Sequence, residues 1–449
     1  MRTRHTPLLL ALLLAFPLPA VAQEVILRDV LTIGGQPYLR TQLKADAANV
    51  SGVGHGIEAA DGECITVTID DQDRLFVHKF DRWLRRLGDP IDGGMVPPPG
   101  TYAGSTLWRG GFVWIMLYDD LVLSVRRIDP RRESPNLDFV AISNIFWEGR
   151  FGLDARDGVL FVVISGNETD GDEFGVFGRI LTYDGTPLTP RLRLAVGPIT
   201  PQYSGNPALT TEGAAVVFRR VPPGRYIRNV YSGEWTMSPW QFLGDVQVGL
   251  WRALPDGNLV LWRIDQVANR VSLQKAAFNG TFIGDPVPLD ILPSGEHFPV
   301  NAHAEMGVAA ARNGVATYQL FDNQWHPKHA QTALAIGATL PVHRIADADY
   351  SDDGTLWISW YATISAFQTF EDYLTAITPL TPGDLDGDGR LTNFDIDPFV
   401  LALTNREAYQ AAFPHIPPEA IDILGDLNGD GVLTNFDIDP FVEALVNGP

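Results

Sequence analysis

The chain has 449 residues, of which 45% are hydrophobic and 19% are charged, and its formal net charge is -21. This length and apolar fraction exclude a mostly disordered chain and leave room for more than one domain. The acidic balance excludes the basic surface that would attract nucleic acids or anionic membranes. Cys64 is the only cysteine, so an intramolecular disulfide is excluded, and its apolar neighbours predict a small buried side chain.

The N-terminus has the pattern of a secretory signal peptide. Two arginines within the first four residues precede an apolar run at residues 8–16, and small residues at positions 20 and 22 form a cleavage site. The run is too short to cross a bilayer, and no second long apolar stretch follows it. We therefore expect residues 1–22 to be removed and the protein to be secreted or held at the cell surface, without a transmembrane segment. An uncleaved N-terminal anchor is the alternative.

One pattern recurs through residues 23–377: a turn that ends in glycine, followed by a run of mostly apolar residues. It occurs seven times, with a mean spacing of about 49 residues. Repeats of this period are typical of propellers and arrays. The glycines that end the turns are Gly62, Gly111, Gly158, Gly213, Gly257, Gly314 and Gly354.

The apolar runs indicate strands that are covered on both faces. The run at residues 112–117 has no polar side, and such a strand must lie between two other layers, as it does between neighbouring propeller blades. We therefore predict a mainly β protein, a seven-bladed β-propeller at residues 23–377, with residues 24–33 adding a strand to the last blade. Tandem β-sandwiches are the alternative, and the uneven spacing also fits six or eight blades. The stretch 158–188 resembles the roughly fifty-residue repeats of secreted bacterial proteins with propeller-like domains.

A Pro-rich segment at residues 378–382 predicts a short linker, and the tail after it is an internal duplication. Residues 383–403 and 425–445 are identical at 18 of 21 positions. Each copy begins a loop with carboxylate or amide side chains at positions one, three, five and twelve and glycine at position six. These side chains are Asp384, Asp386, Asp388 and Asp395 in the first loop, and Asp426, Asn428, Asp430 and Asp437 in the second.

Such loops predict two calcium sites, because calcium is a hard cation that takes six to eight oxygen ligands. Arg390 and Val432 at position seven need to lend only a backbone carbonyl, which explains why their side chains differ. Thr392 and Thr434 at position nine are expected to complete the shell through a hydroxyl or a water. Because the carboxylates of one loop repel each other without a cation, we expect the tail to be poorly folded in the absence of calcium. An acidic turn without an ion is the alternative.

A helix is predicted after each loop. In the first copy, Ile396, Phe399, Val400 and Leu403 fall on one helical face, and Asp397 followed by proline suits an N-cap. The second copy repeats this pattern. We expect the two apolar faces to pack against each other around the connecting segment.

The order of loop then helix, twice, with no helix before the loop, resembles a type I dockerin over residues 383–445. This resemblance implies that the tail docks onto a cohesin-like or other cell-envelope protein. Loop positions ten and eleven would contact that partner, and here they are Asn393, Phe394, Asn435 and Phe436. Cellulosomal dockerins carry small hydroxyl residues there, so a different partner is implied. The sequence NFDIDPF resembles dockerin-like tails of secreted proteins from planctomycete-type bacteria.

Catalytic motifs are scarce. No GxSxG elbow, HExxH helix or glycine-rich phosphate loop is present. Five of the nine histidines lie between residues 297 and 343, but only His326 and His329 are close in sequence, and the proline between them favours an ordinary loop. We therefore favour a non-catalytic binding or structural propeller attached through its calcium tail. A secreted carbohydrate-active hydrolase or lyase is the alternative, and a carbohydrate ligand remains compatible with the 11 tryptophans.

Overall fold

A computed structural model describes the chain from residue 24 to residue 447, so the expected signal peptide at residues 1–22 lies outside the described residues. Within this range, the residues that are not described are 46–56, 61, 70–71, 97–101, 120, 170–173, 197–201, 204–206, 221–223, 245–246, 266–269, 290–298, 302, 313–314, 335–341 and 366–367.

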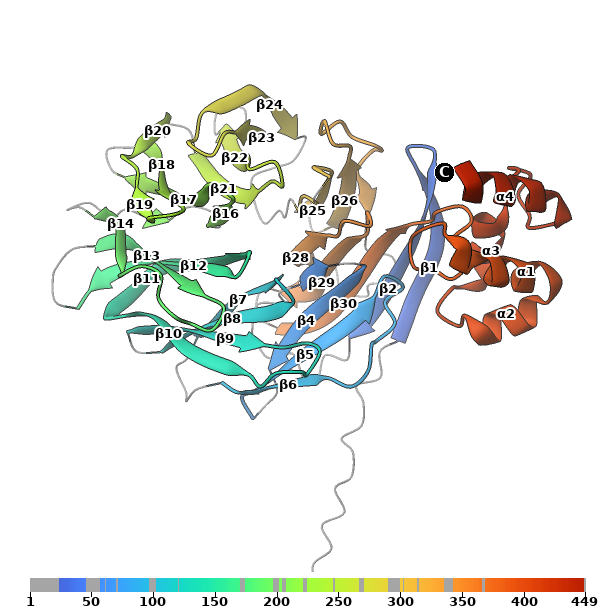
Figure 1. Cartoon of the computed structure of the whole chain (residues 1–449), viewed down its shortest axis with the longest axis horizontal. Helices are drawn as coiled ribbons and strands as arrows, with labels where there is room; N and C mark the ends of the chain where they lie inside the picture. Colours follow the sequence, from blue (N-terminus) through green and yellow to red (C-terminus); the bar gives the residue numbers. More distant parts are fainter. Residues whose placement is uncertain are drawn as a thin grey trace, which may run out of the picture.

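Seven antiparallel sheets stand around a common centre as the blades of a β-propeller (Figure 1). Blades one to three are β3 (Ile57–Ala60), β4 (Glu63–Ile69), β5 (Arg74–Asp81) and β6 (Ile91–Met95); β7 (Tyr102–Arg109), β8 (Phe112–Asp119), β9 (Val122–Ile128) and β10 (Leu137–Ser143); and β11 (Ile145–Arg156), β12 (Val159–Glu168), β13 (Phe174–Thr182) and β14 (Leu192–Val196). Blades four and five are β15 (Gln202–Tyr203), β16 (Ala208–Thr210), β17 (Gly213–Arg220), β18 (Gly224–Tyr231), β19 (Thr236–Met237) and β20 (Gln241–Gly244); and β21 (Gln247–Ala253), β22 (Leu259–Asp265), β23 (Arg270–Ala276) and β24 (Phe282–Leu289). Blades six and seven are β25 (Met306–Arg312), β26 (Val315–Phe321) and β27 (Thr332–Ala333); and β28 (Val342–Tyr350), β29 (Leu356–Ser365), β30 (Gln368–Pro379), β2 (Gln36–Ala45) and β1 (Glu24–Ile33).

The predicted seven-bladed propeller is confirmed, and the alternative of tandem β-sandwiches is wrong. Each of the seven apolar runs is the second strand of its sheet, paired on both sides. The strand before each glycine turn is the innermost one, and these strands contact their neighbours around the centre, as β11 does with β7 and β16. The repeated run is therefore buried because it lies in the middle of a blade that is covered by the next blade on either face.

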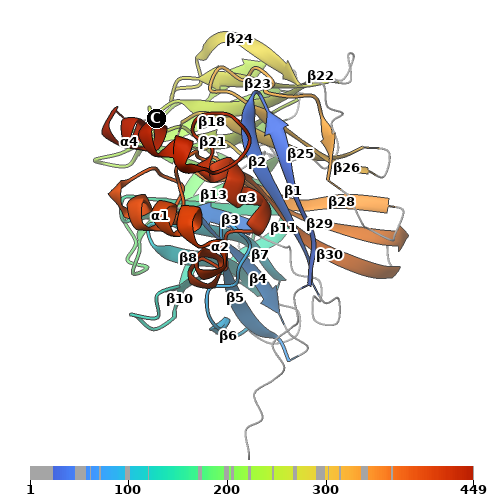
Figure 2. The same cartoon turned by 90° about the vertical axis from the view of Figure 1, so that its right-hand side faces the viewer.

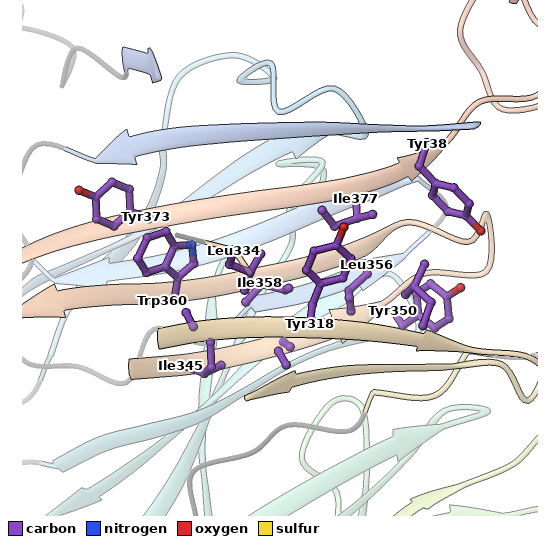
Figure 3. Close-up of a cluster of buried hydrophobic side chains, with 14 of the residues drawn as sticks. Tyr38, Tyr318, Leu334, Ile345, Tyr350, Leu356, Ile358, Trp360, Tyr373 and Ile377 are labelled. Atoms are coloured by element: carbon purple, nitrogen blue, oxygen red, sulfur yellow. The ribbon is translucent and has the colours of Figure 1, made fainter. Parts of the chain in front are cut away.

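Apolar clusters hold neighbouring blades together, and Figure 3 shows the cluster between blades six and seven. There Tyr318 from β26 packs with Ile358 and Trp360 from β29. The Trp360 ring also stacks on Tyr373 with 4.2 Å between ring centroids. Cys64 is fully buried in the cluster that joins blades seven and one, as expected of a small hydrophobic side chain.

The two ends of the propeller sequence complete one blade. Strand β2 pairs with β30 from Tyr38 opposite Pro379 to Ala45 opposite Asp372, and β1 lies outside β2. The expectation that residues 24–33 add a strand to the last blade is confirmed, although β2 lies between that strand and the rest of the blade. The ring of blades is thus closed by backbone hydrogen bonds between N-terminal and C-terminal strands.

The Pro-rich linker expected at residues 378–382 is partly wrong. Strand β30 extends to Pro379, and the Leu380 amide donates a hydrogen bond to the Pro37 carbonyl at 2.9 Å. The Leu380 side chain is buried in a cluster that contains both propeller and tail residues. The segment is therefore fixed to the propeller, because its apolar side chain is covered and its first residues belong to a sheet.

The tail, residues 383–447, contains four short helices beside the outer edge of blade seven (Figures 1 and 2). Within the described part of the chain, none of the helices is long and apolar enough to span a membrane. Helices α1 and α4 follow the two loops as predicted, and their Phe399 and Phe441 rings stack with 4.1 Å between centroids. The helices are α1 (Ile396–Thr404), α2 (Arg406–Ala412), α3 (Pro418–Gly425) and α4 (Ile438–Asn447).

Three details of the predicted tail are wrong. Helix α3 directly precedes the second loop, since its Ala420, Ile421 and Leu424 form a buried face. Asp397 lies inside α1, whose N-cap is Asp395, and the capping box is one turn earlier, where Thr392 and Asp395 bond reciprocally around a 3-10 turn. The expected apolar face is only half buried in each copy: Phe399 and Phe441 are buried and Leu403 and Leu445 are partly buried against the core, whereas Ile396, Val400, Ile438 and Val442 are exposed.

Acid is expected to destabilise blade one through His78 on β5. The Nε2 atom of His78 lies 2.8 Å from the Thr68 hydroxyl, and burial, together with the nearby charge of Arg86, lowers the pKa of His78 to about 4. The unfolded chain has a histidine pKa of about 6.5. Between these values only the unfolded chain binds the proton, so the free energy of unfolding falls as the pH falls from 6.5 to 4, by up to about 3 kcal/mol. Urea unfolding at pH 7 and pH 4.5 measures this loss, which should be smaller in His78→Gln; an equal loss in both proteins would contradict it.

Candidate metal centre

The first loop, residues 384–395, brings three carboxylates together. Carboxylate oxygens of Asp384, Asp386 and Asp388 all lie within 4.8 Å of one another. Backbone amides fix their orientation: Asp384 accepts hydrogen bonds from Gly387 and Gly389, each at 2.8 Å. The Asp388 amide donates to Asp386 at 3.1 Å. The oxygens are therefore close enough to one another to share one small cation.

The loop can turn this sharply because it carries two glycines with positive φ. Gly387 has φ 80° and Gly389 has φ 96°, and Gly429 and Gly431 have the same values in the second loop. A side chain at such a φ is strained, so glycine is favoured at both places. The glycine predicted at loop position six is thus the residue that lets the chain fold back around its own carboxylates.

The aspartate at position twelve closes each loop. The Asp395 side chain is fully buried and accepts hydrogen bonds from the amides of Leu385, Asp386 and Thr392. Asp437 does the same in the second loop with Leu427, Asn428 and Thr434. This contact joins the start of the loop to the helix that follows it.

The residues predicted at positions seven and nine have different surroundings. The hydroxyls of Thr392 and Thr434 accept hydrogen bonds from the Phe394 and Phe436 amides, so these threonines cap the 3-10 turns. The side chains of Arg390 and Val432 are exposed. The type of side chain at position seven therefore has little effect on the loop conformation, since only the backbone carbonyl of that residue would contact an ion.

The second loop, residues 426–437, has the same internal hydrogen bonds. Asp426 accepts from the amides of Gly429, Asp430 and Gly431, and Asp430 accepts from Val432. The Asn428 amide group donates to Asp430 at 3.2 Å. Both loops offer only oxygen ligands on a backbone that is already turned around them, and this donor set fits calcium better than zinc or copper.

Burial distinguishes the two loops. The Asp384 side chain is 1% exposed, whereas Asp426 at the same loop position is only half-buried. Burial raises the pKa of Asp384 to about 7, although the charge of Arg82 opposes the increase. Burial also raises the pKa values of Asp386 and Asp395. Two nearly identical sequences thus have different electrostatic surroundings because only the first loop faces the propeller.

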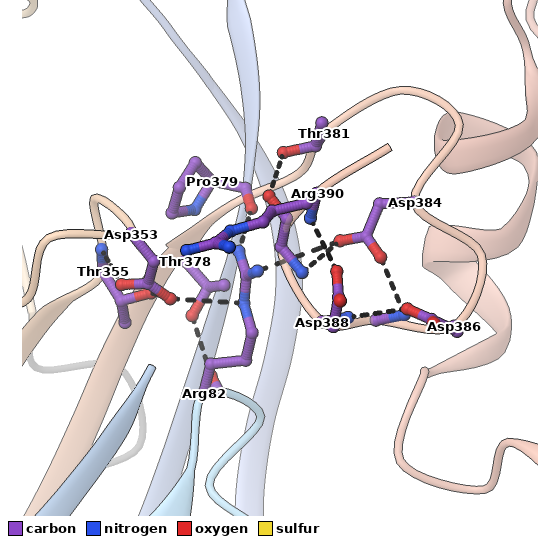
Figure 4. Close-up of polar contacts among 12 residues, drawn as sticks. Arg82, Asp353, Thr355, Thr378, Pro379, Thr381, Asp384, Asp386, Asp388 and Arg390 are labelled. Atoms are coloured by element: carbon purple, nitrogen blue, oxygen red, sulfur yellow. Dashed lines mark hydrogen bonds and ion pairs between the residues drawn. The ribbon is translucent and has the colours of Figure 1, made fainter. Parts of the chain in front are cut away.

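Arg82, in the turn after β5, is one of the propeller residues that contact the first loop (Figure 4). Its guanidinium lies 3.8 Å from an Asp384 carboxylate oxygen and 3.6 Å from Asp353 in blade seven, and it donates to the Pro379 carbonyl at 2.8 Å. The side chain is buried, and a Cβ atom on Gly389 would lie 2.0 Å from it. Arg82 therefore joins two blades to the first loop at close contact.

Trp83 makes the second contact between propeller and tail. Its indole N–H donates to the Gly387 carbonyl at 3.2 Å, and its ring lies beside His415, whose Nε2 atom is 3.0 Å from the Asp386 carbonyl. The same apolar cluster contains Leu39 of the propeller and Leu385 of the tail. Neither Arg82 nor Trp83 was predicted from the sequence, where the available signal was a tryptophan among arginines in a blade turn.

An exposed apolar strip lies beside each loop. Phe394 and Phe436 are 72% and 73% exposed, which is unusual for phenylalanine. Each strip continues onto the following helix through an isoleucine and a valine that are 41% and 51% exposed in both copies. Asn393 and Asn435 are exposed next to them. We call these surfaces the first strip (Phe394, Ile396, Val400) and the second strip (Phe436, Ile438, Val442).

The propeller offers less for catalysis. The hydrolase or lyase alternative requires carboxylates converging at one mouth, where a cavity of about 300 Å³ is lined by Asp154 and Asp352. Both oxygens of Asp154 are already engaged by the amides of Ala155 and Leu209. Among the described histidines, His329 accepts a hydrogen bond from the Leu320 amide, and no histidine joins a metal-binding group in that part of the chain.

Comparison with known proteins finds no matching family model and no matching curated protein. Among solved structures, the chain is similar to polysaccharide lyase Uly1, with a TM-score of 0.47 and 9% identity over 74% of this chain and 92% of that one. It is also similar to the WD40 domain of Toxoplasma gondii coronin (0.43, 7%, 80% and 87%) and to BamB from Moraxella catarrhalis (0.39, 11%, 80% and 98%). These likenesses concern the fold and assign no activity, ligand or partner.

Proposed function

We propose that this chain is a secreted binding protein whose propeller is attached to a cohesin-like or other cell-envelope protein by a calcium-dependent, dockerin-like tail. The observation that carries the proposal is the duplicated loop with an exposed apolar strip beside each copy. Large exposed apolar side chains next to a folded, acidic module are typical of protein-binding surfaces. The signal-peptide pattern supports export, which N-terminal sequencing of the mature protein would test: a start at Gln23 is expected, and a retained N-terminus would contradict it.

Calcium would be held in the first loop by Asp384, Asp386, Asp388 and Asp395 and in the second by Asp426, Asn428, Asp430 and Asp437. When bound, the ion supplies positive charge that offsets the repulsion among these carboxylates. The residues themselves orient the loop and fix the helix after it, so the strips are presented in one geometry.

Two calcium ions are expected to bind, one to each loop. Replacing Asp388 or Asp430 with alanine should remove one ion each, because each supplies the ligand at loop position five. Both side chains are exposed, so the changes should disturb the fold little. These positions avoid Asp384, whose loss would also affect Arg82. Isothermal titration of the metal-free full chain with calcium measures the stoichiometry, and thermal unfolding should shift upward with calcium. Binding of two ions to the double variant would contradict the assignment.

The strips are expected to bind the partner. A pull-down from the envelope of the source organism, in calcium, should recover a protein with the unaltered chain and lose it with Phe394→Ser and Phe436→Ser combined. Because the two strips are almost equally exposed, either single change should retain part of the binding. The exposed Phe146→Ser on the propeller is the control. Recovery of the same proteins by the double variant would show that the strips are not the docking surface.

A further inference from the structure

Three arginines from three different blades line the cavity at the mouth of the propeller. Arg109 ends β7, Arg156 ends β11 and Arg252 lies one residue before the end of β21. Each one is thus at the end of an innermost strand, where the blades converge. The protein as a whole carries a net charge of -21, so a cluster of three arginines around one small cavity is unexpected.

Four acidic groups lie near these arginines, and one of them, Asp352, is an exposed residue of the cavity lining. Asp154 accepts hydrogen bonds from two backbone amides, and Asp349 lies 3.2 Å from Arg252. Arg156 has a partner in Asp157, but that side chain is 80% exposed, so solvent weakens the pair. With three arginines against Asp154 and Asp352 in its lining, the cavity holds more positive than negative formal charge.

Rigid surroundings hold the arginine cluster in place. Arg252 donates to the Val300 carbonyl, which ties blade five to the segment that leads into blade six. Arg109, Arg252 and Asp154 all line the cavity, and the charges of the two arginines oppose the rise in the pKa of Asp154 that its burial causes. Leu209, Leu254 and Pro255 supply an apolar wall. The cavity thus combines positive donors, one apolar side and the exposed Asp352 carboxylate as an acceptor.

We propose that this cavity binds a small, hydroxylated organic oxyanion about the size of a single sugar acid. Guanidinium groups bind carboxylate, sulfate and phosphate oxygens through paired hydrogen bonds. Hydroxyl groups of the ligand would donate to the acceptors of the cavity, and its carbon skeleton would lie on the apolar wall. A cavity of about 300 Å³ admits one such unit rather than a long chain. The proposal rests on the function proposed above, that of a binding propeller, and gives that propeller a ligand.

Calorimetric titration of the full chain in calcium, with four probes, tests the proposal. Glucuronate carries a carboxylate, glucose 6-phosphate carries a phosphate, glucose is neutral, and inorganic phosphate has no carbon skeleton. At least one of the two sugar anions is expected to bind at least tenfold more tightly than glucose and inorganic phosphate. The stronger sugar anion identifies the oxyanion that the site prefers.

Substitutions then locate the site. Arg109→Gln and Arg156→Gln should each weaken binding of that sugar anion about tenfold, whereas Arg131→Gln, at an exposed turn of blade two, should leave it unchanged. Near-ultraviolet circular dichroism confirms that each variant is folded. The proposal is overturned if glucose binds as well as the anions, if none of the four probes binds, or if the cavity variants bind as well as the unaltered chain. These failures would leave the calcium and pull-down results of the tail unaffected, so the two proposals fail separately.

Discussion

Replacing Trp83 with alanine is expected to release the tail from the propeller while both parts stay folded. Trp83 is 2% exposed, donates to the Gly387 carbonyl and belongs to the cluster that joins Leu39 to the core of the tail. Truncating a buried tryptophan costs about 3–5 kcal/mol, and here the loss falls on the contact between the two parts. Small-angle scattering should show a longer molecule, and limited proteolysis should cut near residues 381–382, which follow the last residue that is hydrogen-bonded to the propeller sheet.

The control for this change is Trp325→Ala. Trp325 is also nearly buried, but it packs between blades five and six and does not contact the tail. It should lower the unfolding temperature of the propeller without lengthening the molecule. A folded Trp83→Ala protein with the scattering profile of the unaltered chain would show that other contacts are sufficient to hold the tail.

Replacing Arg82 with methionine is expected to strengthen calcium binding at the first loop and leave the second unchanged. The guanidinium is buried 3.8 Å from Asp384, so it places a positive charge beside the position where a divalent cation would bind. Removing that charge should raise the affinity of the first loop roughly tenfold or more. In the metal-free protein the same change leaves a buried carboxylate without its opposite charge, so that form should lose about 3 kcal/mol of stability.

Calcium titration in an Asp430→Ala background isolates the first loop, because the second is disabled there. Arg390→Met is the matched control: it removes an exposed arginine from the loop itself and should have little effect. Equal or weaker calcium binding by the first loop after Arg82→Met would contradict the expected repulsion. The same titration in an Asp388→Ala background isolates the second loop, and a change of its affinity after Arg82→Met would show that the two loops communicate through the stacked rings of Phe399 and Phe441.

The local pattern of the sequence predicted seven blades, although its uneven spacing also fitted six or eight, and it located the loops. Seven glycine turns, each followed by an apolar run, identified the second strand of every blade, because a strand covered on both faces must be apolar throughout. The loop aspartates were also readable, since their contacts are within twelve residues of one another. The sequence predicted less well which helix residues are buried. Val400 fits the helical spacing of apolar residues but is exposed, because the partner helix covers only the side that Phe399 faces.

What the sequence by itself determined was therefore every feature that depends on neighbours along the chain: the strands, the glycine turns, the paired loops and the helices after them. The tertiary structure alone decided which loop is buried, because Arg82 and Trp83 lie about 300 residues from the loop that they contact. It also decided the cavity, whose arginines come from three blades and form no linear motif. These contacts form only when the propeller closes and the tail packs against it, which brings distant segments together. A repeat pattern along the sequence contains no information about such contacts.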